Sequence, residues 1–172
     1  ACHSSESPSQ PSPAAQHSET GWFGDLPQGF PIPKVPIEQA MSAEKIELGR
    51  HLFYDTRLSG NLTQSCASCH EQDKAFADGK SQSTGSTGDL TPRNSMSLTN
   101  VVYNSTFTWA NPALEHLESQ IVIPLFGKQP VEMGLTGYED EVLMRLAEDD
   151  TYITLFQHAY PGEDNPININ HI

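Results

Sequence analysis

The amino-acid sequence predicts a mainly α-helical domain with long loops and a disordered N-terminal tail. Apolar residues recur at helical spacing in several segments, and no segment shows the alternating pattern of a β-strand. Gly, Ser, Thr and Pro gather between the helical segments, as is typical of loops. At 172 residues, the chain is long enough for one domain with a buried core.

The N-terminal region lacks the apolar residues of a folded core. Residues 1–20 are rich in Ser, Pro and Gln, so we expect a disordered tether. Residues 21–38 place prolines among apolar residues, which predicts an extended strap on the domain surface. Cys2 is followed by a polar linker, as in a bacterial lipoprotein whose signal has been removed. It is either the lipid-bearing residue of an anchor or an unused thiol.

The first helix is predicted over residues 43–53, with Ser42 as its N-cap. Gly49 and Phe53 lie one turn apart on one face, where a glycine allows another helix to approach closely. A turn follows at residues 55–61. The long Gly/Ser/Thr loop at residues 77–95 is of a kind that usually wraps a ligand or carries function.

Three further helices are predicted in the second half of the chain. One begins with Asn111 as its cap and Pro112 in its first position. The others span residues 138–147 and 151–160. Residues 165–172 predict a turn that leads into another helix, so the chain looks truncated.

Composition excludes several classes of function. Nine basic and 22 acidic residues give a net charge of −13, and no basic patch for nucleic acid is present. No apolar run approaches the roughly 20 residues of a transmembrane helix. Hydrophobic residues make up only 36%, which indicates much loop, a core filled partly by something other than side chains, or both.

Cys66, Cys69 and His70 form the C-x-x-C-H pattern of covalent c-type haem attachment. Two thiols on one turn can each bond a vinyl group of one porphyrin edge, and the adjacent histidine can ligate the iron. A thioredoxin-like motif would need a βαβ context, and a zinc site would need a second ligand pair. The pattern therefore predicts one covalent haem c in a periplasmic or surface-facing protein.

The sixth iron ligand separates an electron carrier from a peroxide site. The loop at residues 71–94 contains no His and no Met. Side chains elsewhere that could close the iron are Met96, Met133, Met144, His51, His116 and His158.

Four separated blocks resemble the N-terminal haem domain of the bacterial di-haem cytochrome c peroxidase/MauG superfamily. They are LGRHLFYDTRLSGNLTQSCASCH (48–70), TPRNSMSLTNVVYNSTFTWANP (91–112), LESQ (117–120) and PVEMGL (130–135). The resemblance implies a cytochrome c-like haem domain over residues 39–172, whose first helix makes the close approach at Gly49 and Phe53.

The resemblance also implies roles for individual residues. His70 would be the proximal ligand of the peroxide-reacting haem, and Glu132 the distal carboxylate that moves a proton between the peroxide oxygens. Gln120 would hydrogen-bond bound peroxide. Asn94 would ligate a calcium ion, and Trp109 would relay an electron between two haems. Taken singly, each of the last four has an ordinary structural explanation.

Two departures from the family pattern bear on function. Many members carry a histidine in the loop after C-x-x-C-H, and this chain does not, so it is similar to the open-site MauG/MbnH-like subgroup. That subgroup uses peroxide to oxidise tryptophan side chains of a partner protein. No second C-x-x-C-H occurs in the sequence, so the domain with the second haem would be missing.

These features leave two main hypotheses open. The first is a haem domain that reduces hydrogen peroxide, either with electrons from a small cytochrome or cupredoxin or at the expense of a partner protein. The alternative is a mono-haem electron carrier whose iron is closed by Met133 or another side chain.

Overall fold

The computed structural model describes residues 26–33, 35, 41–109 and 111–172. These residues form four α-helices and five short 3₁₀ helices, and their only sheet-type pairings are isolated bridges between Glu71 and Ala77 and between Thr84 and Leu90. The predicted mainly α-helical class with long loops is confirmed. None of the helices in this part of the chain is long and apolar enough to cross a membrane.

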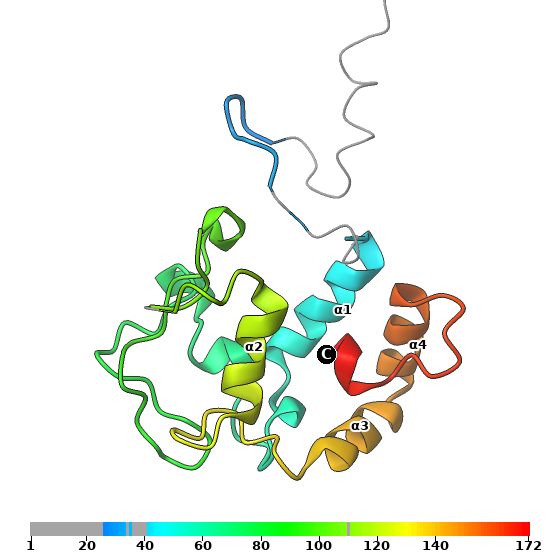
Figure 1. Ribbon diagram of the computed structural model, residues 1–172. Coiled ribbons are helices and arrows are strands. Elements are labelled where there is room, and N and C mark those ends of the chain that lie inside the picture. Colours follow the sequence, from blue (N-terminus) through cyan, green and yellow to red (C-terminus); the bar gives the residue numbers. More distant parts are fainter. Residues whose placement is uncertain (1–25, 34, 36–40, 110) are drawn as a thin grey trace, which may run out of the picture.

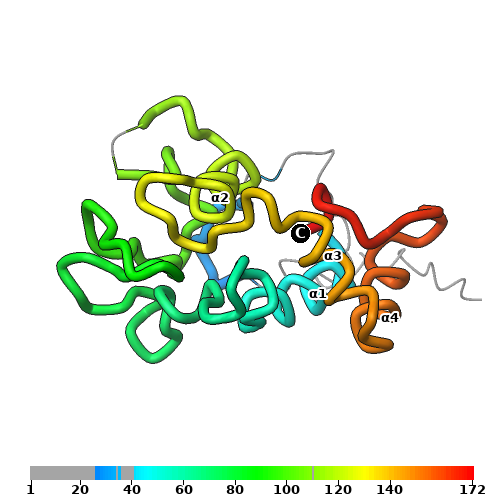
Figure 2. Tube along the Cα trace, turned by 90° about the horizontal axis from the view of Figure 1, so that it is seen from below, coloured from blue at the N-terminus to red at the C-terminus, as the bar shows by residue number. Residues whose placement is uncertain are grey.

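The α-helices are α1 (Ala43–Tyr54), α2 (Leu117–Phe126), α3 (Glu139–Ala147) and α4 (Asp150–Ala159). Figure 1 shows α1 near the centre, with α3, α4 and the C-terminus on one side and α2 and the long loops on the other. The view from below keeps the same division (Figure 2). The tether predicted at residues 1–20 lies outside the described residues. In the described part of the strap, the Phe30 ring contacts Tyr103, whose hydroxyl donates to the Pro31 carbonyl at 3.0 Å.

Helix α1 begins where the sequence predicts. The Ser42 hydroxyl accepts a hydrogen bond from the Lys45 backbone N–H at 3.2 Å, which satisfies one of the free amides of the first turn. The helix packs against α4 through the face that carries Leu48 and Leu52, both buried. Among the described residues the predicted close approach at Gly49 is wrong. A Cβ at this position would meet none of their atoms within 4 Å, because Gly49 lies on another, exposed face.

The predicted start of the second helix is also wrong. The Asn111 side chain accepts from the Ala113 N–H at 3.0 Å and so closes a single turn. The Leu114 carbonyl then accepts from Phe107 rather than from a helical partner, and His116 is extended. Helix α2 therefore starts at Leu117, because the backbone groups that a longer helix would need form hydrogen bonds within the loop.

The core lies where α1, α3 and α4 meet the segment that follows α2. The buried apolar side chains are Leu48, Leu52, Leu58, Leu125, Met133, Leu135, Val142, Leu146, Tyr152, Phe156 and Ala159. Partly buried isoleucines of the C-terminal segment (Ile167, Ile169 and Ile172) pack against this core. The segment after α4 therefore folds back and packs against the core of the domain.

Arg57 joins the end of α1 to the start of α4. Its guanidinium donates to Asp55, next to α1, and to Asp149, the N-cap of α4, at 2.7–3.1 Å. It also lies over the Tyr152 ring, 4.9 Å from the centroid. The buried Tyr152 hydroxyl donates to Asp55 at 2.7 Å. Burial pulls the pKa of Asp55 upward, but the hydrogen bonds from Arg57 and Tyr152 outweigh it and hold the pKa below its usual range.

Candidate haem-binding site

The C-x-x-C-H residues lie on a 3₁₀ turn, Cys66–Ser68, that follows α1 and its connecting turn. The N–H groups of Cys69 and His70 both donate to the Cys66 carbonyl, at 3.2 and 3.0 Å, so the motif folds into one compact turn. Both thiols are free and half-buried. Burial raises the pKa of each, and for Cys69 the carboxylates of Asp78 and Glu132 raise it further.

The His70 imidazole is oriented by a backbone carbonyl. Its Nδ1 lies 2.8 Å from the Phe76 carbonyl oxygen. A carbonyl can only accept, so Nδ1 carries a proton, and in the neutral ring the lone pair is then on Nε2. A hydrogen bond of this type fixes the ring and raises the basicity of a metal-ligating histidine. The hydrogen bond at Nδ1 therefore leaves His70 Nε2 available to bind a metal.

The carbonyl that orients His70 belongs to an unusual loop. Ala75 and Phe76 both have left-handed backbones, with φ of 56° and 58°. Residues with a Cβ rarely adopt this conformation, which costs about 1–2 kcal/mol each. Backbone outliers of this kind cluster at functional sites.

Glu132 lies in the segment that leaves α2 and passes beside the His70 turn. Burial raises the pKa of its carboxyl, while the charge of the His70 imidazole opposes that shift. The backbone on either side is fixed: Ser86 N–H donates to the Glu132 carbonyl at 2.7 Å, and Val131 N–H donates to Asp89 Oδ2 at 3.1 Å. A half-buried carboxyl with a raised pKa suits proton transfer.

The close backbone contact beside Glu132 depends on Gly85. A Cβ at Gly85 would lie 1.8 Å from the Val131 carbonyl oxygen and 3.0 Å from the Glu132 Cα. Two loops distant in sequence therefore touch through their backbones at this point. Only glycine fits there.

Gln120 is half-buried in the first half of α2. Four residues later the carbonyl of Pro124 accepts from Met133 N–H at 2.9 Å, and Leu135 N–H donates to the Leu125 carbonyl at 2.9 Å. Residues one turn apart share a helix face. Gln120 therefore lies one turn along α2 from the point where the Glu132 segment is attached.

Trp109 and Asn94 are brought together. The indole N–H of Trp109 donates to the Asn94 backbone carbonyl at 3.2 Å, and the Arg93 guanidinium lies 5.9 Å from the ring centroid. Trp109 is 48% exposed. The Asn94 side-chain amide donates to the Ser95 carbonyl at 3.2 Å. No group of three or more His, Cys, Asp or Glu side chains is placed to hold a metal ion within the described ranges, so calcium at Asn94 stays a prediction.

The residues of the site fit a covalent haem. The donor set is two free thiols on one turn and an imidazole whose Nε2 makes no hydrogen bond in the described structure.

Sequence reasoning missed the residues that hold the site together. These are the Phe76 carbonyl, Gly85 and the hydroxyls around the loop at residues 75–78. Phe76 lies in the segment AFADG (75–79), for which the sequence predicted no role. Its position six residues after His70 is the signal that could have identified the carbonyl.

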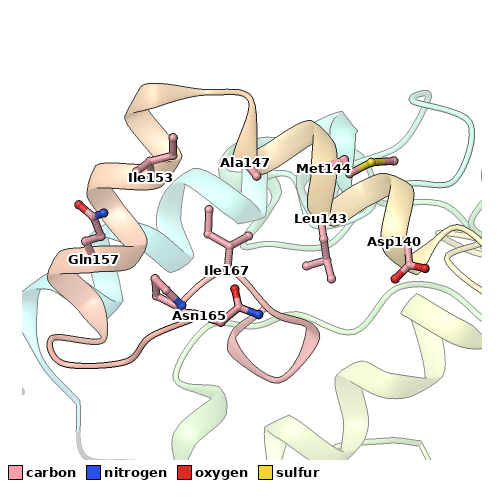
Figure 3. A pocket seen from close by; sticks show the side chains of 9 residues that line it. Asp140, Leu143, Met144, Ala147, Ile153, Gln157, Asn165 and Ile167 are labelled. Carbon is pink, nitrogen blue, oxygen red and sulfur yellow. The ribbon is translucent and has the colours of Figure 1, made fainter.

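A surface cavity lies elsewhere. It has a volume of about 520 Å³ and is formed by α3, α4 and residues 165–167. Figure 3 shows mainly apolar side chains around it, with Asp140 at one end. None of the Cys, His or Glu residues of the C-x-x-C-H region lines it. This cavity has no part in the site described above.

Comparison with known proteins agrees with this geometry. Residues 43–172 match the family described as di-haem cytochrome c peroxidase. Methylamine utilization protein MauG of Methylorubrum extorquens is 31% identical over 85% of this chain and 39% of its own length. Cytochrome-c peroxidase IdrP1 of Denitromonas iodatirespirans is 35% identical over 84% of this chain and 36% of its own length.

A solved structure of a MauG-like protein associated with microbial copper homeostasis is 48% identical and has a TM-score of 0.86. The match covers 88% of this chain and 44% of that one. The chain thus spans less than half the length of each of these relatives. Because the family match runs from the first residue of α1 to Ile172, the chain belongs to the di-haem cytochrome c peroxidase family, which uses haem c.

Proposed function

We propose that this chain is a c-type haem domain that reacts with hydrogen peroxide. The observation that carries the proposal is the presence of two side chains in different environments, one suited to bind iron and one suited to transfer a proton. One is His70, whose Nδ1–H is held by Phe76 so that Nε2 is free. The other is Glu132, a half-buried carboxyl whose pKa is raised by burial. The relatives named as cytochrome-c peroxidase and MauG support the same reaction.

The residues that would hold the haem are Cys66 and Cys69, through thioether bonds, and His70, through Nε2. When bound, the haem supplies the iron that coordinates peroxide and accepts its oxidising equivalents. Glu132 accepts a proton from peroxide and returns it to the departing oxygen, which leaves as water. Gln120 orients the peroxide with its amide. Burial keeps the pKa of Glu132 high enough for it to return the proton.

Two sources of electrons fit this site. A small cytochrome or cupredoxin is the partner in the peroxidase version, and a tryptophan of a partner protein is the substrate in the MauG version. The loop at residues 71–94, which has neither His nor Met, favours an iron open to peroxide. The 48% identity to a MauG-like structure favours the second partner. Trp109 is the side chain through which charge would pass, and Asn94 is a calcium ligand.

The alternative, a mono-haem electron carrier closed by Met133, has less support. Met133 is 6% exposed and belongs to the apolar core. Its backbone is bonded to Pro124 and Gly60. We place the protein in the periplasm or on the cell surface, where c-type haem is attached. A lipid anchor at Cys2 is part of this proposal and lies outside the described residues.

The test uses the haem-loaded protein and one equivalent of hydrogen peroxide. We expect a high-spin ferric spectrum that peroxide changes within seconds. Glu132→Gln should slow this change by roughly 10²–10⁴-fold, because a positioned general acid–base group typically contributes about that factor to the rate. Glu118→Gln, which alters an exposed acid on α2, is the matched control. A low-spin spectrum with no response to peroxide would establish the electron carrier instead.

A further inference from the structure

We propose that the hydroxyl groups of Ser97 and Thr99, helped by Ser95, are positioning groups for the iron ligand. They hold the loop at residues 75–78 in the one conformation that directs the Phe76 carbonyl at His70 Nδ1. The inference rests on one part of the proposed function, namely that His70 binds the iron. We refer to Ser95, Ser97 and Thr99 as the hydroxyl clamp.

The loop needs support because its backbone is unfavourable. Ala75 and Phe76 are consecutive left-handed residues and neither is glycine. Three backbone hydrogen bonds join the loop to residues 71–74. Phe76 N–H donates to the Glu71 carbonyl at 2.9 Å, Ala77 N–H donates to the Lys74 carbonyl at 3.2 Å, and Glu71 N–H donates to the Ala77 carbonyl at 3.1 Å. Such a conformation persists only where the surroundings over-determine it.

The clamp completes the restraint on the first peptide unit of the loop. Ser97 Oγ donates to the Ala75 carbonyl at 2.6 Å, and Thr99 Oγ1 donates to the same oxygen at 3.2 Å. The peptide between Ala75 and Phe76 is planar. Its carbonyl is now held by two hydroxyls and its N–H by Glu71, so its orientation is fixed at both ends.

The next peptide unit carries the functional contact. Its carbonyl, that of Phe76, accepts from His70 Nδ1, and its N–H, that of Ala77, donates to Lys74. The two planes share the Phe76 Cα. The left-handed φ of Phe76 relates the two planes, so by holding the first plane the clamp restricts the directions open to the Phe76 carbonyl.

Ser95 secures the far end of the loop. Its Oγ accepts from the Asp78 N–H at 2.8 Å and donates to Asp78 Oδ1 at 3.1 Å. Asp78 is 2% exposed, so this contact is shielded from competing water. The clamp residues lie directly after Asn94, whose carbonyl accepts from Trp109. A continuous set of hydrogen bonds thus connects the Trp109 region to the His70 loop.

The chemistry predicts the effect of removing the clamp. The bond from Nδ1–H to Phe76 makes Nε2 a stronger donor. If the Phe76 carbonyl moves away from Nδ1, Nε2 becomes a weaker electron-pair donor to the iron. Ferric iron is then less well stabilised, and the reduction potential of the haem rises. The iron–histidine bond also weakens in the ferrous protein.

The experiment compares the haem-loaded parent with the double variant Ser97→Ala/Thr99→Val. The readouts are the iron–histidine stretching band in the resonance Raman spectrum of the ferrous protein and the haem midpoint potential. We expect the band to move to lower frequency and the potential to move positive. We also expect a loss of up to roughly tenfold in peroxide rate, the lower end for outer-shell partners of a metal site. Ser97→Thr keeps a hydroxyl and should restore the parent values.

Ser105→Ala, which removes an exposed hydroxyl from the same block, should change nothing. If the double variant does not accumulate, the single variants decide, and the shift should be larger for Ser97→Ala because its bond is shorter. Parent-like bands and potentials in the variants would overturn the inference. Absence of an iron–histidine band in the parent itself would instead overturn the assignment of His70.

Discussion

The backbone contact at Gly85 gives the most direct test of how Glu132 is positioned. Gly85 has no left-handed backbone that would require glycine, so the reason for glycine there is space alone. The substitution Gly85→Ala places a methyl group against the carbonyl oxygen of Val131. The carbonyl oxygen belongs to the backbone and not to a flexible side chain, so the backbone has to move to make room.

The size of the displacement follows from the structure. The new carbon would start 1.8 Å from the Val131 oxygen, and real contacts of this kind do not fall below 3.0 Å. The two loops must therefore separate by more than about 1 Å. This movement breaks or lengthens the 2.7 Å bond from Ser86 N–H to the Glu132 carbonyl. Overpacking and one lost hydrogen bond together cost about 2–4 kcal/mol.

The functional loss is expected to exceed what instability explains. A misplacement of about 1 Å can cost roughly 10²-fold in rate. We therefore expect Gly85→Ala to slow the peroxide reaction about 100-fold at a temperature where the variant remains folded. The assay is stopped-flow spectroscopy of the haem-loaded variant beside a thermal melt. A parent-like rate together with a parent-like melting temperature would refute the reasoning.

Four further predictions concern the fold and the acid. Arg57→Ala should lower the free energy of unfolding by about 2 kcal/mol, because it removes the ion pair to Asp149 and the contact with the buried Tyr152 ring. Chemical denaturation measures this change. In the same experiment Arg50→Ala, at an exposed ion pair, should change the free energy of unfolding by less than about 0.5 kcal/mol. The rate of the peroxide reaction should fall as the pH drops through the raised pKa of Glu132, because only the ionised carboxylate accepts a proton. A rate that stays level down to about pH 4.3, the ordinary pKa of a glutamate, would contradict this prediction. The same raised pKa means that the ionised carboxylate destabilises the fold as pH rises, so Glu132→Gln should melt no earlier than the parent at neutral pH. Gly49→Ala should raise stability by up to about 1 kcal/mol, since a methyl group there meets open space, and a destabilised variant would show that the face is covered.

Much of the local structure could be predicted because it depends on neighbours in the chain. Ser42 caps α1 through a hydrogen bond that spans three residues. Helices α3 and α4 follow from apolar spacing within ten residues. The error at Asn111 shows the limit: its capping chemistry is real, but it closes one turn because Leu114 bonds to a residue earlier in the loop.

The sequence by itself determined the haem-attachment motif, the mainly helical class and the family, because each is written in short segments of chain. Only the tertiary structure decided which groups serve the site. The Phe76 carbonyl reaches His70 through a loop whose left-handed residues carry no sequence signal. The Glu132 segment lies against the loop at residues 85–86 because Gly85 lets two distant backbones touch. Carbonyl directions and backbone contacts of this kind arise from hydrogen bonds between segments far apart in sequence, and residue spacing does not encode them.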